Sequence, residues 1–265
     1  MHVHVTLMPS EFAHLALADR TALVVDVLRA SSTVVAAFAA GCAAVIPVAT
    51  PAEARERAAT MGPPAPMLVG EQDGLAIPGF DLGNSPLECT KARVGGRTLV
   101  LTTTNGTAAM LKARKAAGAC VGALSNVSAA AAWARRQGRD VTVLCAGEKG
   151  RFCLEDAVCA GLIAERLLRG SGEAKLSDAA RAAWALGCLY GPRLDRLRRD
   201  SAWARTLAAR GRGADLDACL ALDSAAIVPI LEQGALVPNP GAALTCLEAA
   251  ADTRAGRLAR PDANR

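Results

Sequence analysis

The chain has 265 residues, which is enough for one large domain or two small ones with a sizeable core. Hydrophobic residues make up 52% of it but aromatic ones only 3%, so the core must consist mainly of Ala, Val and Leu, which suits helices packed closely on a sheet. The net charge of +5 is mild and no basic stripe with interleaved aromatics is visible, which argues against nucleic acid as a partner and fits a small anionic substrate.

Nine cysteines are scattered along the chain and form no C-x-x-C pair. This pattern argues against a disulfide framework or a zinc site and favours a reducing compartment. The first residues show no signal pattern, and the apolar runs are too short or too interrupted to span a bilayer. We therefore expect a soluble cytoplasmic protein without a membrane partner. A homo-oligomer is left open.

Apolar runs alternate with segments of helical period throughout the chain. The predicted strands are 3–7, 22–26, 42–48, 67–69, 98–102, 119–124 and 141–145, with a late candidate at 226–230. The predicted helices start at Ser31 or Ser32, at the capping box of Thr50, at Ala108, at Ser125 or Ser128, at Leu154, at Ser177, at Ser201 and at Asp215. Such alternation predicts an α/β fold whose mainly parallel sheet is covered on both faces.

A strand, a polar turn and an Ala-rich helix follow one another from Val24, again from Leu99 and again from Val141. These repeated strand-turn-helix units predict a single domain over residues 1–251, with two similar lobes as an option. The polar, Arg-rich segment 252–265 is expected to be a disordered tail.

The segment 79–86 concentrates polar groups in a long loop. Ser85 to Glu88 reads as a capping box with proline at the first helical position, so the loop would end on a helix N-terminus that favours an anion. Asp81 would repel that anion unless a cation lay between them, which points to a divalent metal. The alternative is that Asp81 and Asn84 only hold a turn through local hydrogen bonds.

Ligands bind beyond the carboxyl ends of the strands in open parallel sheets. Several groups of polar residues lie at those predicted strand ends, together with the loop 79–86. In chain order they are Asp26 with Arg29, Ser31 and Ser32; Glu71; Thr103, Thr104, Asn105, Gly106 and Thr107; and the turn 147–150, which is followed by Glu155 and Asp156. Each residue could be a simple cap or ion pair, but five carboxylates at one edge would be costly without a cation. Mg²⁺ prefers such oxygen ligands.

Other chemistries lack their motifs. No dinucleotide-binding, P-loop or nucleophile-elbow pattern occurs. Asp26 after an apolar strand is loosely similar to the aspartyl-phosphate phosphatases of the haloacid-dehalogenase type. Leu28 stands where their general-acid aspartate would be, so that mechanism is not expected.

Three segments, 25–33, 70–86 and 103–107, resemble the 2-phosphosulfolactate phosphatase (ComB) family, and the similarity spans about residues 7–238. Weaker matches are Ala146-Gly147, Glu155-Asp156 and Ser177-Asp178. The chain departs from the family pattern at Gln72, where arginine is expected, and at Cys153, where serine is common. The resemblance implies a three-layer α/β/α sandwich with a mainly parallel or mixed sheet. It also implies Mg²⁺-dependent hydrolysis of 2-phospho-3-sulfolactate to sulfolactate and phosphate, a step towards coenzyme M.

We expect the following roles for these residues, both from their chemistry and from this resemblance. Asp26, Glu71 and Asp81 would be catalytic, and the metal ligands would be drawn from Asp26, Asp81, Glu155 and Asp156. The substrate anions would be held by Arg29, Ser31, Ser32, Asn84, Ser85, Thr104, Asn105, Gly106 and Thr107. Two alternatives stay open, a different phosphorylated hydroxy acid as substrate and a non-catalytic module that binds phosphorylated or sulfonated anions.

Overall fold

The computed structural model describes residues 1–169 and 174–239 of the chain, so the predicted tail at 252–265 lies outside the described residues. Within them, eleven strands form one sheet in the order β5-β4-β6-β3-β11-β10-β7-β2-β8-β1-β9. The strands are β1 (His2–Thr6), β2 (Thr21–Val25), β3 (Ala44–Pro47), β4 (Met67–Gln72), β5 (Leu75–Ala76), β6 (Thr98–Thr102), β7 (Gly118–Gly122), β8 (Val141–Cys145), β9 (Lys175–Leu176), β10 (Pro229–Glu232) and β11 (Ala235–Pro238).

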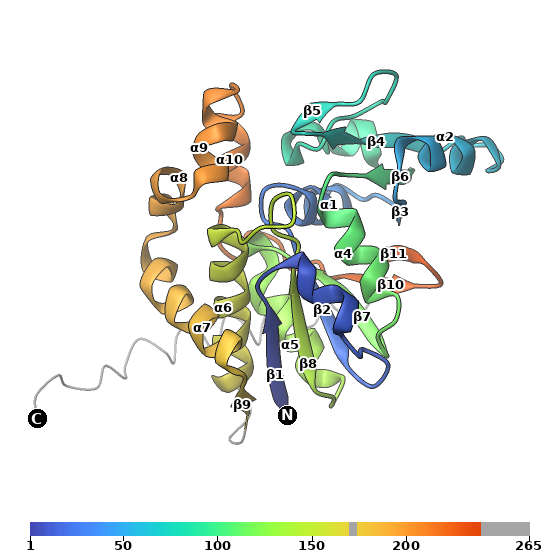
Figure 1. Ribbon diagram of the computed structural model, residues 1–265. Coiled ribbons are helices and arrows are strands. Elements are labelled where there is room, and N and C mark those ends of the chain that lie inside the picture. Colours follow the sequence, from blue (N-terminus) through green and yellow to red (C-terminus); the bar gives the residue numbers. More distant parts are fainter. Residues whose placement is uncertain (170–173, 240–265) are drawn as a thin grey trace, which may run out of the picture.

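The sheet consists of two parallel groups joined by an antiparallel hairpin. Strands β7, β2, β8, β1 and β9 are parallel to one another, and so are β4, β6 and β3. The hairpin β10–β11 lies between the groups and pairs with each through one residue pair, Ile230 with Cys120 and Leu236 with Val45. The sheet can turn at such sparse pairing, and Figure 1 shows β2 and β8 running in a clearly different direction from β4 and β6.

Helices cover both faces of the sheet, as the alternation of side chains on β2 shows. Leu23 and Val25 belong to a core shared with the helices α5, α6, α7, α9 and α10, whereas Ala22 and Val24 belong to a core shared with α1 and α4. Successive strand residues point to opposite faces, so β2 is buried between two helical layers. The predicted α/β class, with a mixed and mainly parallel sheet, is confirmed.

The helical elements follow the strands in regular succession. The α-helices are α1 (Ala30–Ala39), α2 (Pro51–Ala59), α3 (Lys91–Val94), α4 (Gly106–Ala113), α5 (Val127–Arg136), α6 (Leu154–Arg169), α7 (Asp178–Tyr190), α8 (Leu197–Asp200), α9 (Ala202–Ala209) and α10 (Gly213–Cys219). The 3₁₀ segments are η1 (Pro9–His14), η2 (Pro86–Glu88), η3 (Leu124–Asn126) and η4 (Gly191–Arg196). None of the helices within the described ranges is long and apolar enough to cross a membrane.

Some predicted helix starts are confirmed by their hydrogen bonds. The Thr50 hydroxyl accepts the Glu53 N–H (3.1 Å), and the Glu53 carboxylate accepts the Ala49 N–H (2.8 Å), which completes a capping box. Ser177 and Ser201 likewise cap α7 and α9.

Other predicted starts are wrong. Ser31 and Ser32 lie inside the first turn of α1, neither Ser125 nor Ser128 caps α5, and Asp215 lies inside α10. The expected helix after Ser85 is only the three-residue segment η2, which Ser85 does not cap. The Glu88 carboxylate accepts the Gly83 N–H instead (2.9 Å). The anion-binding helix N-terminus predicted there is therefore absent.

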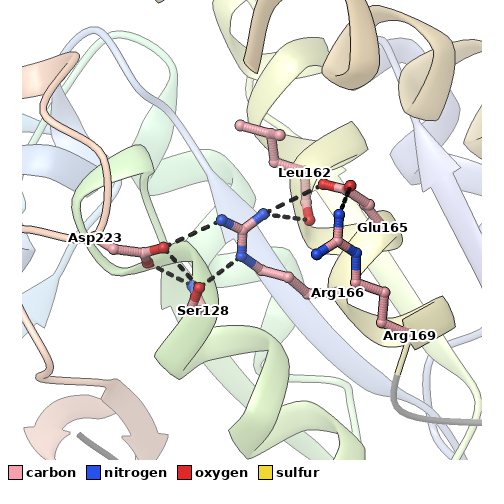
Figure 2. A network of polar contacts seen from close by, with 6 residues as sticks. All are labelled: Ser128, Leu162, Glu165, Arg166, Arg169 and Asp223. Carbon is pink, nitrogen blue, oxygen red and sulfur yellow. Dashed lines mark hydrogen bonds and ion pairs between the residues drawn. The ribbon is translucent and has the colours of Figure 1, made fainter. Parts of the chain in front are cut away.

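A polar network fixes the chain where it returns from α10 to β10 (Figure 2). The Asp223 carboxylate accepts the backbone N–H and hydroxyl of Ser128 (2.7 and 2.6 Å) and pairs with Arg166 (3.1 Å). Arg166 also donates to the Ser128 hydroxyl (2.6 Å), and Glu165 pairs with both Arg166 and Arg169. Because Ser128 lies on α5 and Arg166 on α6, this network anchors the end of the α8–α10 segment against the body of the fold.

Candidate active site

A small cavity lies where the loops after β2, β4, β6 and β8 meet α9. It is lined by Asp26, Leu28, Arg29, Glu71, Asp73, Gly74, Asn84, Thr104, Asn105, Glu148 and Trp203. Sequence reasoning had selected six of these residues, namely Asp26, Arg29, Glu71, Asn84, Thr104 and Asn105. Figure 1 shows α9 and α10 at the same end of the molecule as β4 and β5, so the C-terminal helices help to enclose the site.

Asp26 follows β2 and is buried. Its Oδ1 accepts the Ala30 N–H (3.1 Å), and its own N–H donates to the Ser31 hydroxyl (2.9 Å). No hydrogen bond from the described residues reaches Oδ2. Burial, followed by the negative charges of Glu71, Glu148 and Glu155, raises the pKa of Asp26 to about 7. The ionised carboxylate is therefore held at a cost that a nearby cation would remove.

Glu71 near the end of β4 connects two of the loops. Its Oε1 accepts the Thr104 N–H (2.8 Å), and its Oε2 accepts the Gly74 N–H (2.5 Å) and the Thr104 hydroxyl (3.2 Å). Every oxygen of this carboxylate thus has a donor, and the Thr104 hydroxyl is directed to Glu71. This arrangement holds the β4–β5 turn against the loop after β6.

Glu148 was not selected from the sequence, although it lies in the turn that follows β8, three residues after the end of that strand. Its Oε2 accepts the Asn105 side-chain amide (2.8 Å), whose Oδ1 in turn accepts the Lys149 N–H (2.9 Å). Glu148 is half-buried, and burial together with the charge of Glu71 raises its pKa. Its position after an apolar strand was the signal that could have identified it.

Arg29 is oriented by a residue far away in the sequence. Its Nη1 pairs with the Asp215 carboxylate of α10 (2.5 Å), and its Nη2 donates to the Gly74 carbonyl (3.3 Å). The Ser85 hydroxyl donates to the other Asp215 oxygen (2.6 Å). All three side chains are buried. Asp215 therefore sets the position of the guanidinium at the cavity, and Ser85 acts on Asp215 instead of presenting its hydroxyl to a ligand.

Several residues expected to bind the substrate serve the backbone instead. The Ser31 hydroxyl binds Asp26 N–H, Ser32 donates to the Val27 carbonyl (2.8 Å) and Thr107 donates to the Thr103 carbonyl (3.0 Å). Gly106 contributes space, because a Cβ there would lie 2.6 Å from Asp26 Oδ2. None of these four residues lines the cavity.

Asp156 uses both of its oxygens inside the protein. Oδ1 accepts the Val27 N–H (2.8 Å) and Oδ2 accepts the Gly147 N–H (3.0 Å). These two residues are the neighbours of Asp26 and Glu148 in sequence, so Asp156 fastens together the loops that carry both carboxylates. The expectation that Asp156 is a metal ligand does not fit this geometry. Glu155, the other expected ligand, is buried, lines a separate pocket and does not line the cavity.

The structure places Asp81 away from the other carboxylates, against the prediction that it is catalytic and binds metal. Its side chain is exposed, and Oδ2 accepts the Leu68 N–H (2.7 Å) near the start of β4, whereas Glu71 lies near the other end of that strand. Asp81 does not line the cavity. The observed hydrogen bond also differs from the local turn bond of the alternative interpretation, because Leu68 lies 13 residues away in the sequence, on β4.

The cavity offers oxygen atoms that suit Mg²⁺. No group of three or more His, Cys, Asp or Glu side chains is arranged as a metal cluster in residues 1–169 and 174–239. However, Asp26 Oδ2 and Glu148 Oε1 accept no hydrogen bond within those ranges, and Asn84 Oδ1 is buried without a partner. One or two carboxylates, completed by water and substrate oxygens, are the usual protein contribution to a Mg²⁺ site. The donor set therefore fits.

Comparisons with known proteins agree with the resemblance. The model of the family described as 2-phosphosulpholactate phosphatase matches residues 6–234. A relative from Thermus thermophilus is 41% identical over 233 residues, which is 87% of this chain and 94% of that protein. Relatives from Symbiobacterium thermophilum (38% over 221 residues, 83% of this chain and 95% of that protein) and Deinococcus radiodurans (40% over 219 residues, 82% and 90%) are similar. Each of the three is described as a probable 2-phosphosulfolactate phosphatase.

Proposed function

Since the chain belongs to the 2-phosphosulpholactate phosphatase family of phosphoric monoester hydrolases, we propose that it hydrolyses 2-phospho-3-sulfolactate to 3-sulfolactate and phosphate with the help of Mg²⁺. The observation that carries the proposal is the cavity itself. It combines Asp26 with a pKa raised to about 7, the unpartnered Asn84 oxygen and a buried arginine at the ends of four strands.

Charge balance supports a cation in this reaction. Four carboxylates line the cavity, those of Asp26, Glu71, Asp73 and Glu148, and Arg29 is the one cationic residue among the lining residues. A phosphate ester would be repelled by this set, whereas a bound Mg²⁺ would offset the repulsion and stabilise negative charge on the phosphoryl oxygens.

Burial distinguishes the proposed roles of Asp26 and Glu148. Asp26 is fully buried, and its ionised form needs a neighbouring cation, so Asp26 and Asn84 would hold the metal. Glu148 is half-buried and its raised pKa favours exchange of a proton with solvent, so it would accept the proton of the attacking water. The water oxygen would then bond to phosphorus as the ester P–O bond breaks, and the leaving alkoxide would take up a proton from solvent water.

Arg29 would position the phosphate or the sulfonate. Its two bonds, to Asp215 and to the Gly74 carbonyl, leave further N–H donors of the guanidinium available. Because Asp215 already fixes the group, little rotamer entropy is lost when the substrate binds.

Gln72, at which the chain departs from the family pattern, is exposed and does not line the cavity.

The test is phosphate release from 2-phospho-3-sulfolactate by the wild-type chain and by Glu148→Gln, with Mg²⁺ and with EDTA. We expect activity only with Mg²⁺ and at least a 100-fold lower kcat for the variant, in the range of general-base catalysis. Equal rates with Mg²⁺ and EDTA would remove the metal from the mechanism. Turnover of another phosphorylated 2-hydroxy acid but not of this ester would change the substrate. Thermal stabilisation by the ester without any turnover would instead favour the binding-module alternative.

A further inference from the structure

A second and larger pocket adjoins the cavity. Its volume is about 670 Å³. Its lining residues are Glu148, Lys149, Arg151, Phe152, Cys153, Leu154, Glu155, Asp200, Ser201, Ala202, Trp203 and Thr206. Glu148 and Trp203 line both spaces, so the two are contiguous. The loop after β8 forms one side of this pocket and the start of α9 the other.

The wall of this pocket contains apolar surface that folding does not explain. Phe152 is 44% exposed, although the whole chain holds only four Phe, three Trp and one Tyr. Leu154, Ala202 and Trp203 lie around the same space. Exposed aromatic surface concentrated at a hollow marks a ligand contact more often than a structural need.

Trp203 forms a rigid part of this wall. Its indole N–H donates to the Leu28 carbonyl (2.9 Å), and the guanidinium of Arg210 lies over its ring at 5.6 Å from the centroid. Leu28 precedes Arg29, so the hydrogen bond links the indole to the loop that carries the phosphate-binding arginine. A group lying on Trp203 would therefore be held at a fixed place relative to the reacting phosphate.

The pocket also presents an unsatisfied polar atom. Glu155 is 1% exposed, and its Oε2 has no hydrogen-bond partner among the residues that the structure describes. Leaving a buried acceptor without a donor is costly, so an occupant that carries an O–H or N–H group would be stabilised there. Sulfolactate has three carbons, each carrying a polar substituent or next to one, and offers no apolar group to this wall.

We propose that the second pocket receives an aromatic ring with a hydrogen-bond donor, carried by the alcohol part of the substrate. The inference rests on the proposed phosphatase activity and extends its substrate class to phosphate esters of aryl-substituted 2-hydroxy acids. The ring packs against Phe152 and Trp203, its donor reaches the Glu155 carboxylate, and the phosphate lies next to Asp26 and Arg29.

The test compares kcat/KM for 2-phospho-3-(4-hydroxyphenyl)lactate and 2-phospholactate, which differ only in the hydroxyphenyl group. We expect a preference of about 30-fold for the aryl ester, within the range that an apolar pocket supplies. Ala202→Trp, which fills the pocket from the start of α9, should reduce this preference about tenfold. Ala208→Trp adds the same side chain at an exposed position of the same helix and should leave the preference unchanged.

Phe152→Ala is a second, independent test of the pocket, because the Phe152 side chain is exposed and its removal should leave the fold intact. It should also lower the preference for the aryl ester. Equal kcat/KM for the two esters, or equal losses on both in Ala202→Trp and Phe152→Ala, would overturn the inference. Hydrolysis of 2-phospho-3-sulfolactate without hydrolysis of the aryl ester would overturn the inference while the proposed function stands. Failure on all three esters would overturn both.

Discussion

Replacing Asp26 by asparagine should make the metal-free protein more stable at alkaline pH while abolishing its activity. The folded state raises the pKa of Asp26 from 3.8 to about 7. Between these values the folded state binds more protons than the unfolded state, so the free energy of unfolding of the wild type falls as the pH rises from about 4 to about 7. The variant does not titrate there, and an Asn Oδ1 can still accept the Ala30 N–H.

The size of the effect follows from the pKa shift. At about 1.4 kcal/mol per pKa unit, the shift from 3.8 to about 7 amounts to roughly 4 kcal/mol once Asp26 is fully ionised. The difference between variant and wild type should be near zero at pH 4 and complete above about pH 8. For a domain of this size that corresponds to a rise in Tm of about 10 °C. Mg²⁺ should stabilise the wild type at pH 8 and narrow the gap, because it binds only the folded site.

The assay is thermal unfolding of both proteins at pH 5 and pH 8, in EDTA and in Mg²⁺. Asp81→Asn is the matched control, since it removes a carboxylate of the same type that is exposed and lies outside the cavity. It should show no gain in Tm at pH 8 and should leave phosphatase activity close to that of the wild type. A gap between Asp26→Asn and the wild type that is the same at both pH values would refute the assignment of the unfavourable charge to Asp26.

Three further substitutions test the supports of the site. Gly106→Ala places a methyl group 2.6 Å from Asp26 Oδ2 and should lower kcat at least tenfold at a stability cost of about 1–3 kcal/mol, measured by kinetics and urea unfolding. Asp156→Asn can accept only one of the two N–H groups, of Val27 and Gly147, that Asp156 binds. The variant should lower kcat and leave KM unchanged, because the loops that carry Asp26 and Glu148 shift while Arg29 stays in place. Unchanged kinetics would contradict the positioning role of Asp156. Asp215→Asn leaves Arg29 buried without a counter-charge. It should lower the free energy of unfolding by about 3–5 kcal/mol and raise KM. A loss below about 1 kcal/mol in urea unfolding would show that the ion pair is not needed for stability.

The sheet was largely predictable because its strands are local apolar runs. The run 141–145 coincides with β8, and the run 22–26 overlaps β2 (Thr21–Val25) with a shift of one residue. The strand β11 was missed because Ala235–Pro238 is short and ends in proline, so its strand character depends on pairing with β10 and β3. That pairing joins segments far apart in the sequence, which local patterns cannot report.

Asp81 shows how a dense polar segment can mislead. The prediction assumed that Ser85 and Glu88 would cap each other, which would have placed Asp81 beside a helix N-terminus. In the structure both side chains have other partners, Asp215 for Ser85 and the Gly83 N–H for Glu88. The segment then runs along the start of β4, and Asp81 binds Leu68. A capping box is a statement about local hydrogen bonds, and it fails when a distant residue offers a better partner.

Glu71, Asp26 and Glu148 share one feature, since each lies near the end of a strand or within three residues after it, and the loop after that strand enters the cavity. The rule that ligands bind beyond the carboxyl ends of parallel strands selects them, although the strands belong to two groups related by an antiparallel hairpin. The rule works here because the sheet turns at β10–β11. It has no means of finding Asp215, which lies on a helix 186 residues away from its partner Arg29.

The Arg29–Asp215 pair explains why the C-terminal helices belong to the site. A buried guanidinium without a counter-charge would be strongly unfavourable, so Arg29 can lie at the cavity only if α10, which carries Asp215, is docked against η2. Asp215 enforces that docking by binding both Arg29 and Ser85, and Trp203 on α9 completes the enclosure through its bond to Leu28. The strands supply the carboxylates, but the cavity is enclosed only after the last helices have closed on it, which ties formation of the site to completion of the whole fold.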